Sequence, residues 1–157
     1  MDEFLNESFF LRLSRLFRLY DKSLRNRLAL HGVNPGYLAV LQCLWANEMV
    51  TQTDLGHQLD IEQATLSNTL RRMERDGLIQ RTPNPNDRRY RPIALTNDGR
   101  ASKEPVLKAL DELQQVVNEG LTTNDRRYFY RILRQMTARL EDDIVEPLFV
   151  LTDEIPE

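Results

Sequence analysis

The spacing of the apolar residues changes partway along this chain, and the change restricts the folds open to it. From residue 9 to residue 76 they recur at three- and four-residue steps, the period of amphipathic helices. In "LIQRTP" (residues 78–83) and "YRPIAL" (residues 90–95) they alternate instead, around the polar loop "NPNDRR". Alternation on both sides of a short loop rich in proline and asparagine predicts a two-stranded hairpin.

Capping and turn signals divide the helical parts of the chain. Asn34 and Pro35 suit the start of a helix, Thr51 and Asp54 have capping-box spacing, and Gly77 suits a helix end. The predicted helices span about residues 9–28, 35–46, 51–59, 62–76, 106–120 and 124–140. Thr96 can cap a short helix after the hairpin, and we expect Pro105 to interrupt it.

Three short helices followed by a hairpin predict a winged helix-turn-helix, which is a DNA-binding architecture. The fold class is therefore mainly α with a small β-hairpin wing and long N- and C-terminal helices. Because such long helices have little of their own domain to pack on, we expect a homodimer. The predicted parts of this one domain are an N-terminal dimerisation helix, a DNA-binding core, and C-terminal dimerisation helices with a tail, at residues 1–33, 34–100 and 101–157.

Composition favours a cytoplasmic protein without a membrane span. No run of eighteen apolar residues occurs, and the acidic start "MDEFLNESFF" is unlike a signal peptide. The single cysteine, Cys43, cannot form an internal disulfide, and its apolar neighbours favour a buried structural thiol over a redox sensor. His31 and His57 have no second ligand at metal spacing, so we expect no metal and no cofactor.

Positive charge is concentrated in the middle of an acidic chain. The net charge is −3, but residues 61–100 carry eight arginines and five acidic residues, a balance of +3. Residues 1–60 sum to −1 and residues 101–157 to −5. A basic segment that coincides with the predicted helix-turn-helix and hairpin favours nucleic acid as the partner.

The predicted helix at residues 62–76 has one apolar side, made by Leu66, Leu70 and Met73. Its other side carries the candidate DNA contacts Gln63, Ala64, Ser67, Asn68, Arg71 and Arg72. Amide side chains can pair with adenine edges and arginine with guanine, while Arg72 and Ser67 suit phosphates. The alternative is an ordinary solvated helix face.

The hairpin tip offers a second candidate contact. Arg88 and Arg89 follow the turn residues Asn84, Pro85 and Asn86, and arginine inserts readily into a narrow minor groove. Asp87 can hold one of the arginines in a single rotamer. The alternative is a loop whose charges only keep it solvated.

The stretch from Thr53 to Arg100 resembles the DNA-binding core of the multiple-antibiotic-resistance regulator (MarR) family. The resemblance is carried by "RMERDGLIQR" (residues 72–81), by the wing pattern Asp87-x-Arg89 and by "LTNDG" (residues 95–99). It implies an obligate homodimer that places one recognition helix in the major groove and one wing in the minor groove per subunit. Two positions depart from the family: Glu62 stands where a serine cap is common, and Asn68 where an arginine is frequent.

The resemblance also implies a function: a sequence-specific double-stranded DNA-binding transcriptional regulator, a repressor released by a small, often aromatic effector. The effector pocket would lie between the dimerisation helices and the winged core, with Phe17, Tyr20, Tyr37 and Trp45 as its candidate wall. The alternative is a winged-helix module that binds protein instead of DNA. An enzyme is not expected, because no phosphate-binding loop, nucleophile elbow or partnered histidine occurs.

Overall fold

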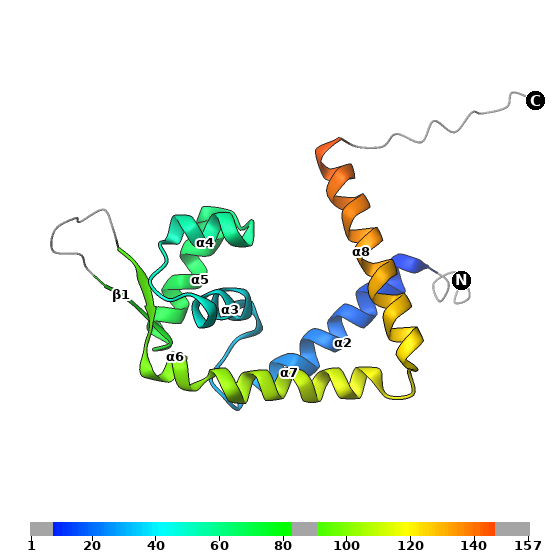
Figure 1. Cartoon of the computed structure of the whole chain (residues 1–157), viewed down its shortest axis with the longest axis horizontal. Helices are drawn as coiled ribbons and strands as arrows, with labels where there is room; N and C mark the ends of the chain where they lie inside the picture. Colours follow the sequence, from blue (N-terminus) through cyan, green and yellow to red (C-terminus); the bar gives the residue numbers. More distant parts are fainter. Residues whose placement is uncertain (1–7, 83–90, 147–157) are drawn as a thin grey trace, which may run out of the picture. The chain divides into compact units, whose positions relative to one another are not determined.

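The computed structural model describes residues 8–82 and 91–146. The chain divides into two units, residues 1–114 and 115–157. The elements are α2 (Phe9–Ala29), η1 (Pro35–Tyr37), α3 (Leu38–Ala46), α4 (Gln52–Leu59), α5 (Gln63–Arg75), β1 (Ile79–Arg81), β2 (Ile93–Leu95), α6 (Asn97–Ala101), α7 (Lys103–Asn118) and α8 (Thr123–Val145) (Figure 1). The predicted fold class, mainly α with a small hairpin, is confirmed.

Two helix starts differ in detail from the prediction. The Asn34 side chain accepts a hydrogen bond from the Gly36 N–H at 2.9 Å, but the first turn is a 3-10 helix, closed by a bond from Tyr37 N–H to the Asn34 carbonyl. The prediction that Pro105 interrupts a helix is wrong. Helix α7 begins at Lys103, so Pro105 lies in its first turn. The backbone nitrogens of a first turn have no carbonyl partner within the helix, so proline costs little there.

The core of the first unit joins two of the predicted dimerisation helices, α2 and α7, to the winged part. Leu24 and Leu28 of α2 are buried in it together with residues of α3, α4 and α5. The strands add Ile79 and Ile93, and α7 adds Leu113 to the same cluster. One end of α2 is therefore anchored on the winged core, whereas its N-terminal half exposes large apolar side chains: Phe9, Phe10, Leu13, Leu16, Phe17 and Leu19.

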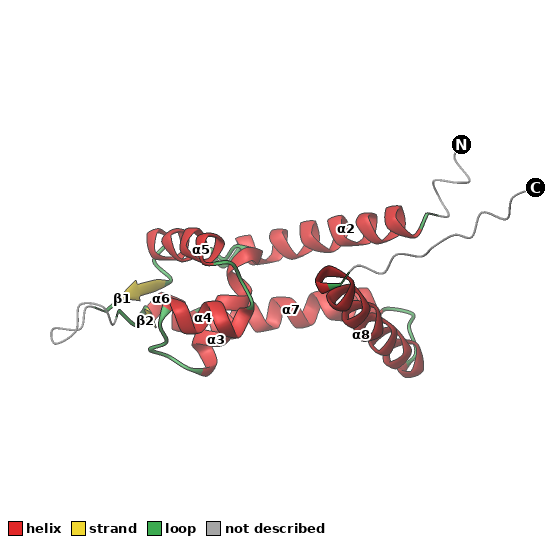
Figure 2. Ribbon diagram, turned by 90° about the horizontal axis from the view of Figure 1, so that it is seen from above, coloured by secondary structure: helices red, strands yellow, loops and turns green. Residues whose placement is uncertain are grey.

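The hairpin pairs its two strands antiparallel, with Gln80 opposite Ala94. Strand β2 leads directly into α6, and the two strands lie beside the start of that helix (Figure 2). A third segment extends the ladder, because Ile93 N–H donates to the Val50 carbonyl at 2.8 Å and Met49 N–H donates to the Ile93 carbonyl at 3.2 Å. The loop between α3 and α4 therefore holds the base of the hairpin.

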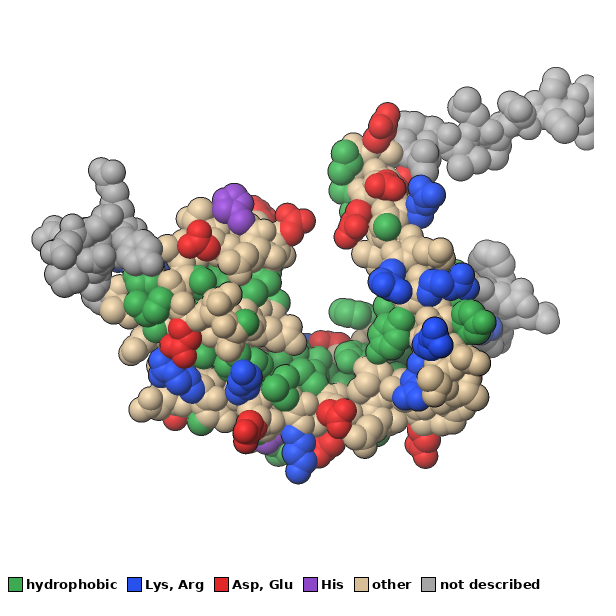
Figure 3. All heavy atoms as spheres, viewed as in Figure 1, with side chains coloured by type: hydrophobic (Ala, Val, Ile, Leu, Met, Phe, Trp, Pro, Cys, Tyr) green, Lys and Arg blue, Asp and Glu red, His purple; other side chains and the backbone are tan. Residues whose placement is uncertain are grey.

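In the second unit, α8 begins with a capping box formed by Thr122 and Asp125. No residue of α8 is buried, and its exposed apolar side chains include Phe129, Leu133 and Leu140. On the face seen in Figure 3, basic side chains gather on the first half of this helix and acidic ones near its end. Among the residues that the structure describes, no helix has both the length and the apolar character needed to cross a bilayer.

Candidate nucleic-acid interface

Helices α4 and α5 form a helix-turn-helix with a tight connection. Asp60 ends α4 in the left-handed conformation, with a φ of 49°, and Ile61 N–H donates back to the Gly56 carbonyl at 3.2 Å. The Gln52 amide donates to Gln63 Oε1 at 3.3 Å, from the start of one helix to the start of the next. A Cβ on Gly56 would meet the Gln63 side chain, so the small residue lets the two helices approach closely.

Helix α5 is fixed from behind by its apolar side. Leu66, Leu70 and Met73 are each 0% exposed, as the helical period predicted. The first turn of the helix contains no acidic residue, and Arg72 and Arg75 lie in its last turn. The rigid attachment leaves the opposite face free to meet a partner.

The candidate contacts lie on that opposite face. Gln63, Ala64, Asn68, Arg71 and Arg72 are exposed and Ser67 is half-buried. Arg71 Nη1 donates to Asn68 Oδ1 at 3.3 Å, so the two candidate base readers already lie side by side. Glu62 precedes the helix, and its side chain makes no capping hydrogen bond.

Thr96 caps α6, as the sequence predicted, and its hydroxyl also attaches the hairpin to the end of α5. The Thr96 hydroxyl donates to the Gly77 carbonyl at 2.6 Å and accepts from the Gly99 N–H at 3.0 Å. A Cβ on Gly99 would collide with the Leu78 carbonyl oxygen, so the packing there requires glycine. The "LTNDG" motif therefore fixes the base of the wing, whereas the tip residues Asp87, Arg88 and Arg89 lie outside the described residues.

A second set of contacts joins the hairpin base to α3. The Trp45 indole N–H donates to the Gly99 carbonyl at 3.0 Å. Glu48 accepts two hydrogen bonds from Arg100, at 2.9 and 2.7 Å, and this interaction lowers the pKa of the Glu48 carboxyl. Trp45 and Glu48 therefore help to position the base of the wing, although they are distant from it in sequence.

Tyr37 connects the start of α3 to the end of α5. Its side chain is buried, and its hydroxyl donates to Asp76 Oδ2 at 2.7 Å, while Arg75 Nε donates to Asp76 Oδ1 at 2.9 Å. The hydrogen bonds from Arg75 and then from Tyr37 lower the pKa of Asp76. Burial, followed by the hydrogen bond to Asp76, raises the pKa of Tyr37.

The four candidate effector residues occupy different environments. Tyr37 lines a cavity of about 450 Å³ beside α5, whose described lining does not include the other three. Trp45 is half-buried and hydrogen-bonded to the hairpin base, Tyr20 is half-buried against the core, and Phe17 is 69% exposed. A pocket formed by all four residues together stays a prediction.

The cysteine and the two histidines lie in the described part of the chain. Cys43 is half-buried and packs against the core, so it is less enclosed than the buried structural thiol that the sequence favours. His31 and His57 are both exposed. Over residues 8–82 and 91–146, no group of three or more histidine, cysteine or acidic residues could hold a metal ion.

Comparison with known proteins identifies relatives of one kind. Residues 33–90 match the model of the MarR family. The chain is 44% identical over 77 residues to the organic hydroperoxide resistance transcriptional regulator of Bacillus subtilis (strain 168), covering 49% of this chain and 50% of that one. It is 32% identical over 124 residues to the HTH-type transcriptional regulator TtmR of Methylorubrum extorquens (strain PA1), covering 77% and 61%. The chain thus spans about half to three-fifths of these two regulators.

Solved structures agree with these relatives over a longer part of the chain. The transcriptional repressor CouR, bound to a 23-mer DNA duplex, matches with a TM-score of 0.72 and 26% identity, over 85% of this chain and 94% of CouR. The similarity therefore extends beyond the winged core to elements on both sides of it.

Proposed function

We propose that the chain is a MarR-family protein and a sequence-specific, double-stranded DNA-binding transcriptional regulator that acts as a homodimer. One observation carries the proposal: α5 is fully buried along its apolar side and offers an exposed face without acidic residues in its first turn. That face is held at the surface by the helix-turn-helix and can enter the major groove of DNA.

Within the groove, each exposed side chain of α5 has a chemical partner. Gln63 and Asn68 present amides that suit adenine, and Arg71 suits the O6 and N7 acceptors of guanine. Ala64 is small enough for the helix backbone to approach the bases. Ser67 and Arg72 bind phosphates, which set the register of the helix on the duplex.

The wing adds a contact to the neighbouring minor groove. Its base is fixed by hydrogen bonds of Thr96, Gly99 and Trp45. Arg89, with Arg88 beside it, enters the minor groove, and Asp87 orients the arginine. These three roles remain predictions from the sequence.

The proposed homodimer brings together two copies of α5, each with its own wing. The N-terminal half of α2 and all of α8 leave apolar side chains exposed, and burial of these side chains against a second copy would remove them from water. Two-fold symmetry then requires an imperfectly palindromic operator.

We further infer repression that is relieved by a small aromatic effector, without a cofactor or metal. Support comes from CouR, whose printed description is a transcriptional repressor, and from the contact that links the Tyr37-lined cavity to the end of α5. A regulator of this kind acts in the cytoplasm, where the DNA is. The relatives are transcriptional regulators, which agrees with a chain that is not an enzyme.

The alternative, a winged-helix module that binds protein, has weaker support. Such a module has no need for basic side chains on the recognition helix. Here Arg71, Arg72 and Arg75 are all exposed on α5. The exposed guanidinium groups favour DNA.

Replacing Asn68 and Arg89 separately tests the proposed roles, which are base reading by α5 and minor-groove contact by the wing. Asn68→Ala should cost about 1–3 kcal/mol at one operator position per half-site, with little change in non-specific binding. Arg89→Ala should weaken binding to operator and scrambled duplex alike, with a salt dependence flatter by roughly 0.9 log units per lost contact. Asp87→Ala should resemble Arg89→Ala in milder form. The measurement is a titration of each variant against both duplexes at several salt concentrations.

Two results would contradict the roles proposed for Asn68 and Arg89. If Arg89→Ala binds both duplexes as the parent does, the wing tip is only a solvated loop. If Asn68→Ala weakens both duplexes equally, then Asn68 reads no base.

A further inference from the structure

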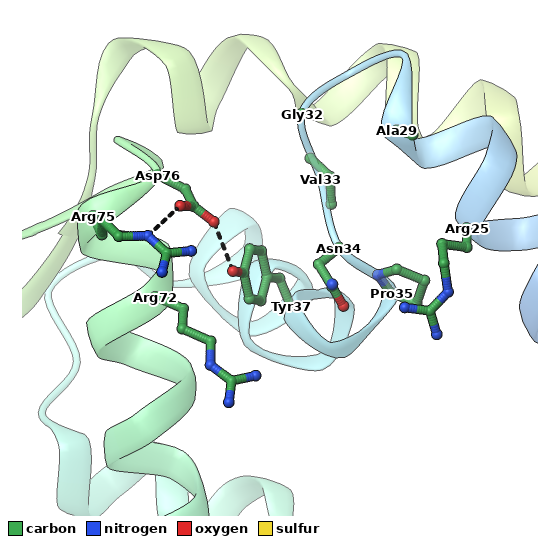
Figure 4. A pocket seen from close by; sticks show the side chains of 10 residues that line it. All are labelled: Arg25, Ala29, Gly32, Val33, Asn34, Pro35, Tyr37, Arg72, Arg75 and Asp76. Carbon is green, nitrogen blue, oxygen red and sulfur yellow. Dashed lines mark hydrogen bonds and ion pairs between the residues drawn. The ribbon is translucent and has the colours of Figure 1, made fainter.

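An arginine-lined cavity lies beside the recognition helix, on the side that faces α2 and η1. It measures about 450 Å³ and is open to solvent. Its charged lining consists of Arg25 from the last turns of α2, Arg72 and Arg75 from α5, and Asp76 just after α5. Figure 4 shows Arg25 and Arg72 on either side of Tyr37 and Pro35, with both arginine side chains extending downward in the view.

The charges of this cavity do not cancel. Asp76 is the one carboxylate in its described lining, and both of its oxygens already accept hydrogen bonds, from Arg75 and Tyr37. Within the described ranges Arg72 makes no ion pair. Arg25 pairs with Asp21 at 2.7 Å through Nη2 alone, in an exposed pair of the kind that contributes little. The cavity lining therefore carries three guanidinium groups and one carboxylate, and both oxygens of that carboxylate are already hydrogen-bonded. The excess of positive charge favours binding of an anion.

We propose that this cavity binds a phosphate oxyanion, supplied by the DNA backbone, with Arg25 and Arg72 as its two donors. The inference rests on the proposed DNA-binding function and adds to it a residue from α2, outside the helix-turn-helix. Guanidinium groups suit phosphate because their planar N–H donors can bind two of its oxygens at once. Arg75 adds positive charge while its Nε holds Asp76.

The position of the cavity explains why the phosphate would belong to DNA. A helix in the major groove has a phosphate backbone on each side. One side of α5 faces α4, where Gln63 meets Gln52. The cavity lies on its other side, where Arg72 is shared between the exposed face of the helix and the arginine-lined cavity. A backbone phosphate beside Arg72 would therefore also come within the reach of Arg25.

Arg25→Gln provides the test, with Arg18→Gln as its matched control. Both arginines are exposed on α2, and a seven-residue separation puts them on the same face, but Arg18 does not line the cavity. Arg25→Gln should weaken binding to operator and scrambled duplex alike and flatten the salt dependence by roughly 0.9 log units per lost contact. Arg18→Gln should bind as the parent does. Sedimentation should show that both variants keep the parent's oligomeric state.

The outcomes separate this site from the proposed function. If Arg25→Gln keeps the parent's affinity and salt slope while Asn68→Ala loses operator discrimination, the phosphate site is wrong and the DNA-binding function stands. If Arg18→Gln is as impaired as Arg25→Gln, general helix charge accounts for the effect and the site is again wrong.

A second measurement does not depend on DNA. Inorganic phosphate, titrated against chloride at constant ionic strength, should produce saturable NMR shifts at the amides of Gly32, Gly36 and Asp76 in the parent, and none in Arg25→Gln. If the parent binds no DNA, this titration decides the anion site alone. The absence of saturable shifts in the parent would overturn it.

Discussion

Replacing Leu70 with alanine is expected to lower the free energy of unfolding by about 2–5 kcal/mol. Leu70 is 0% exposed and lies at the centre of the apolar side of α5, between Leu66 and Met73. Truncation removes buried methyl groups and leaves a cavity, because neighbours on α5 and in the core relax only partly. Urea denaturation followed by circular dichroism measures the change as a shift of the midpoint.

Asn68→Ala is the matched control in the same helix. Asn68 is exposed, so its replacement should change the free energy of unfolding by no more than about 0.5 kcal/mol. Leu70→Ala should therefore lower the free energy of unfolding, whereas Asn68→Ala should lower the discrimination between operator and scrambled DNA. A cost below about 1 kcal/mol for Leu70→Ala would show that α5 is not packed through this side.

Replacing Leu133 with glutamate is expected to separate the subunits of the proposed dimer. Leu133 belongs to the stripe of Phe129, Leu133, Met136 and Leu140 along α8, a stripe with three- and four-residue spacing and no buried member. A charge buried there in a dimer without a partner costs about 3–5 kcal/mol, which is more than a hundred-fold in the dissociation constant. Sedimentation equilibrium should show the parent at twice the 18.4 kDa chain mass and the variant shifted toward single chains or aggregates.

Gln135→Glu introduces the same charge two residues away, on another face of α8. Gln135 is exposed and lies outside the apolar stripe. This variant should remain a dimer at concentrations where Leu133→Glu does not. A parent that sediments at 18.4 kDa, or a Leu133→Glu variant that stays dimeric, would contradict the assignment of α8 to the interface.

The local sequence predicted much of the fold. The period of the apolar residues located α5 to within a residue or two and named its buried side, because a surface helix must place its apolar face on the core. The capping box of Thr51 and Asp54 located the start of α4, because its hydrogen bonds join residues only three apart. Such signals depend on neighbours in the sequence.

Contacts between distant segments could not be predicted in this way. The sequence predicts Tyr37 and Trp45 as walls of an effector pocket, but it does not predict that their polar atoms bond to Asp76 and to the Gly99 carbonyl, 39 and 54 residues away. Nothing in the local pattern of either aromatic residue distinguishes a pocket wall from a buried hydrogen-bond donor. The same reason explains why the sequence does not predict that Arg25 of α2 and Arg72 of α5 line one cavity.

Selection of duplexes from a random double-stranded pool tests the central claim most directly. A homodimer that presents two copies of α5 should select an imperfect palindrome whose half-site centres lie roughly 10 base pairs apart. The wing contact predicts a preference for A·T pairs where the minor groove is narrow. An asymmetric motif, a single-stranded motif or no enrichment at all would contradict the account of this chain as a dimeric DNA-binding regulator.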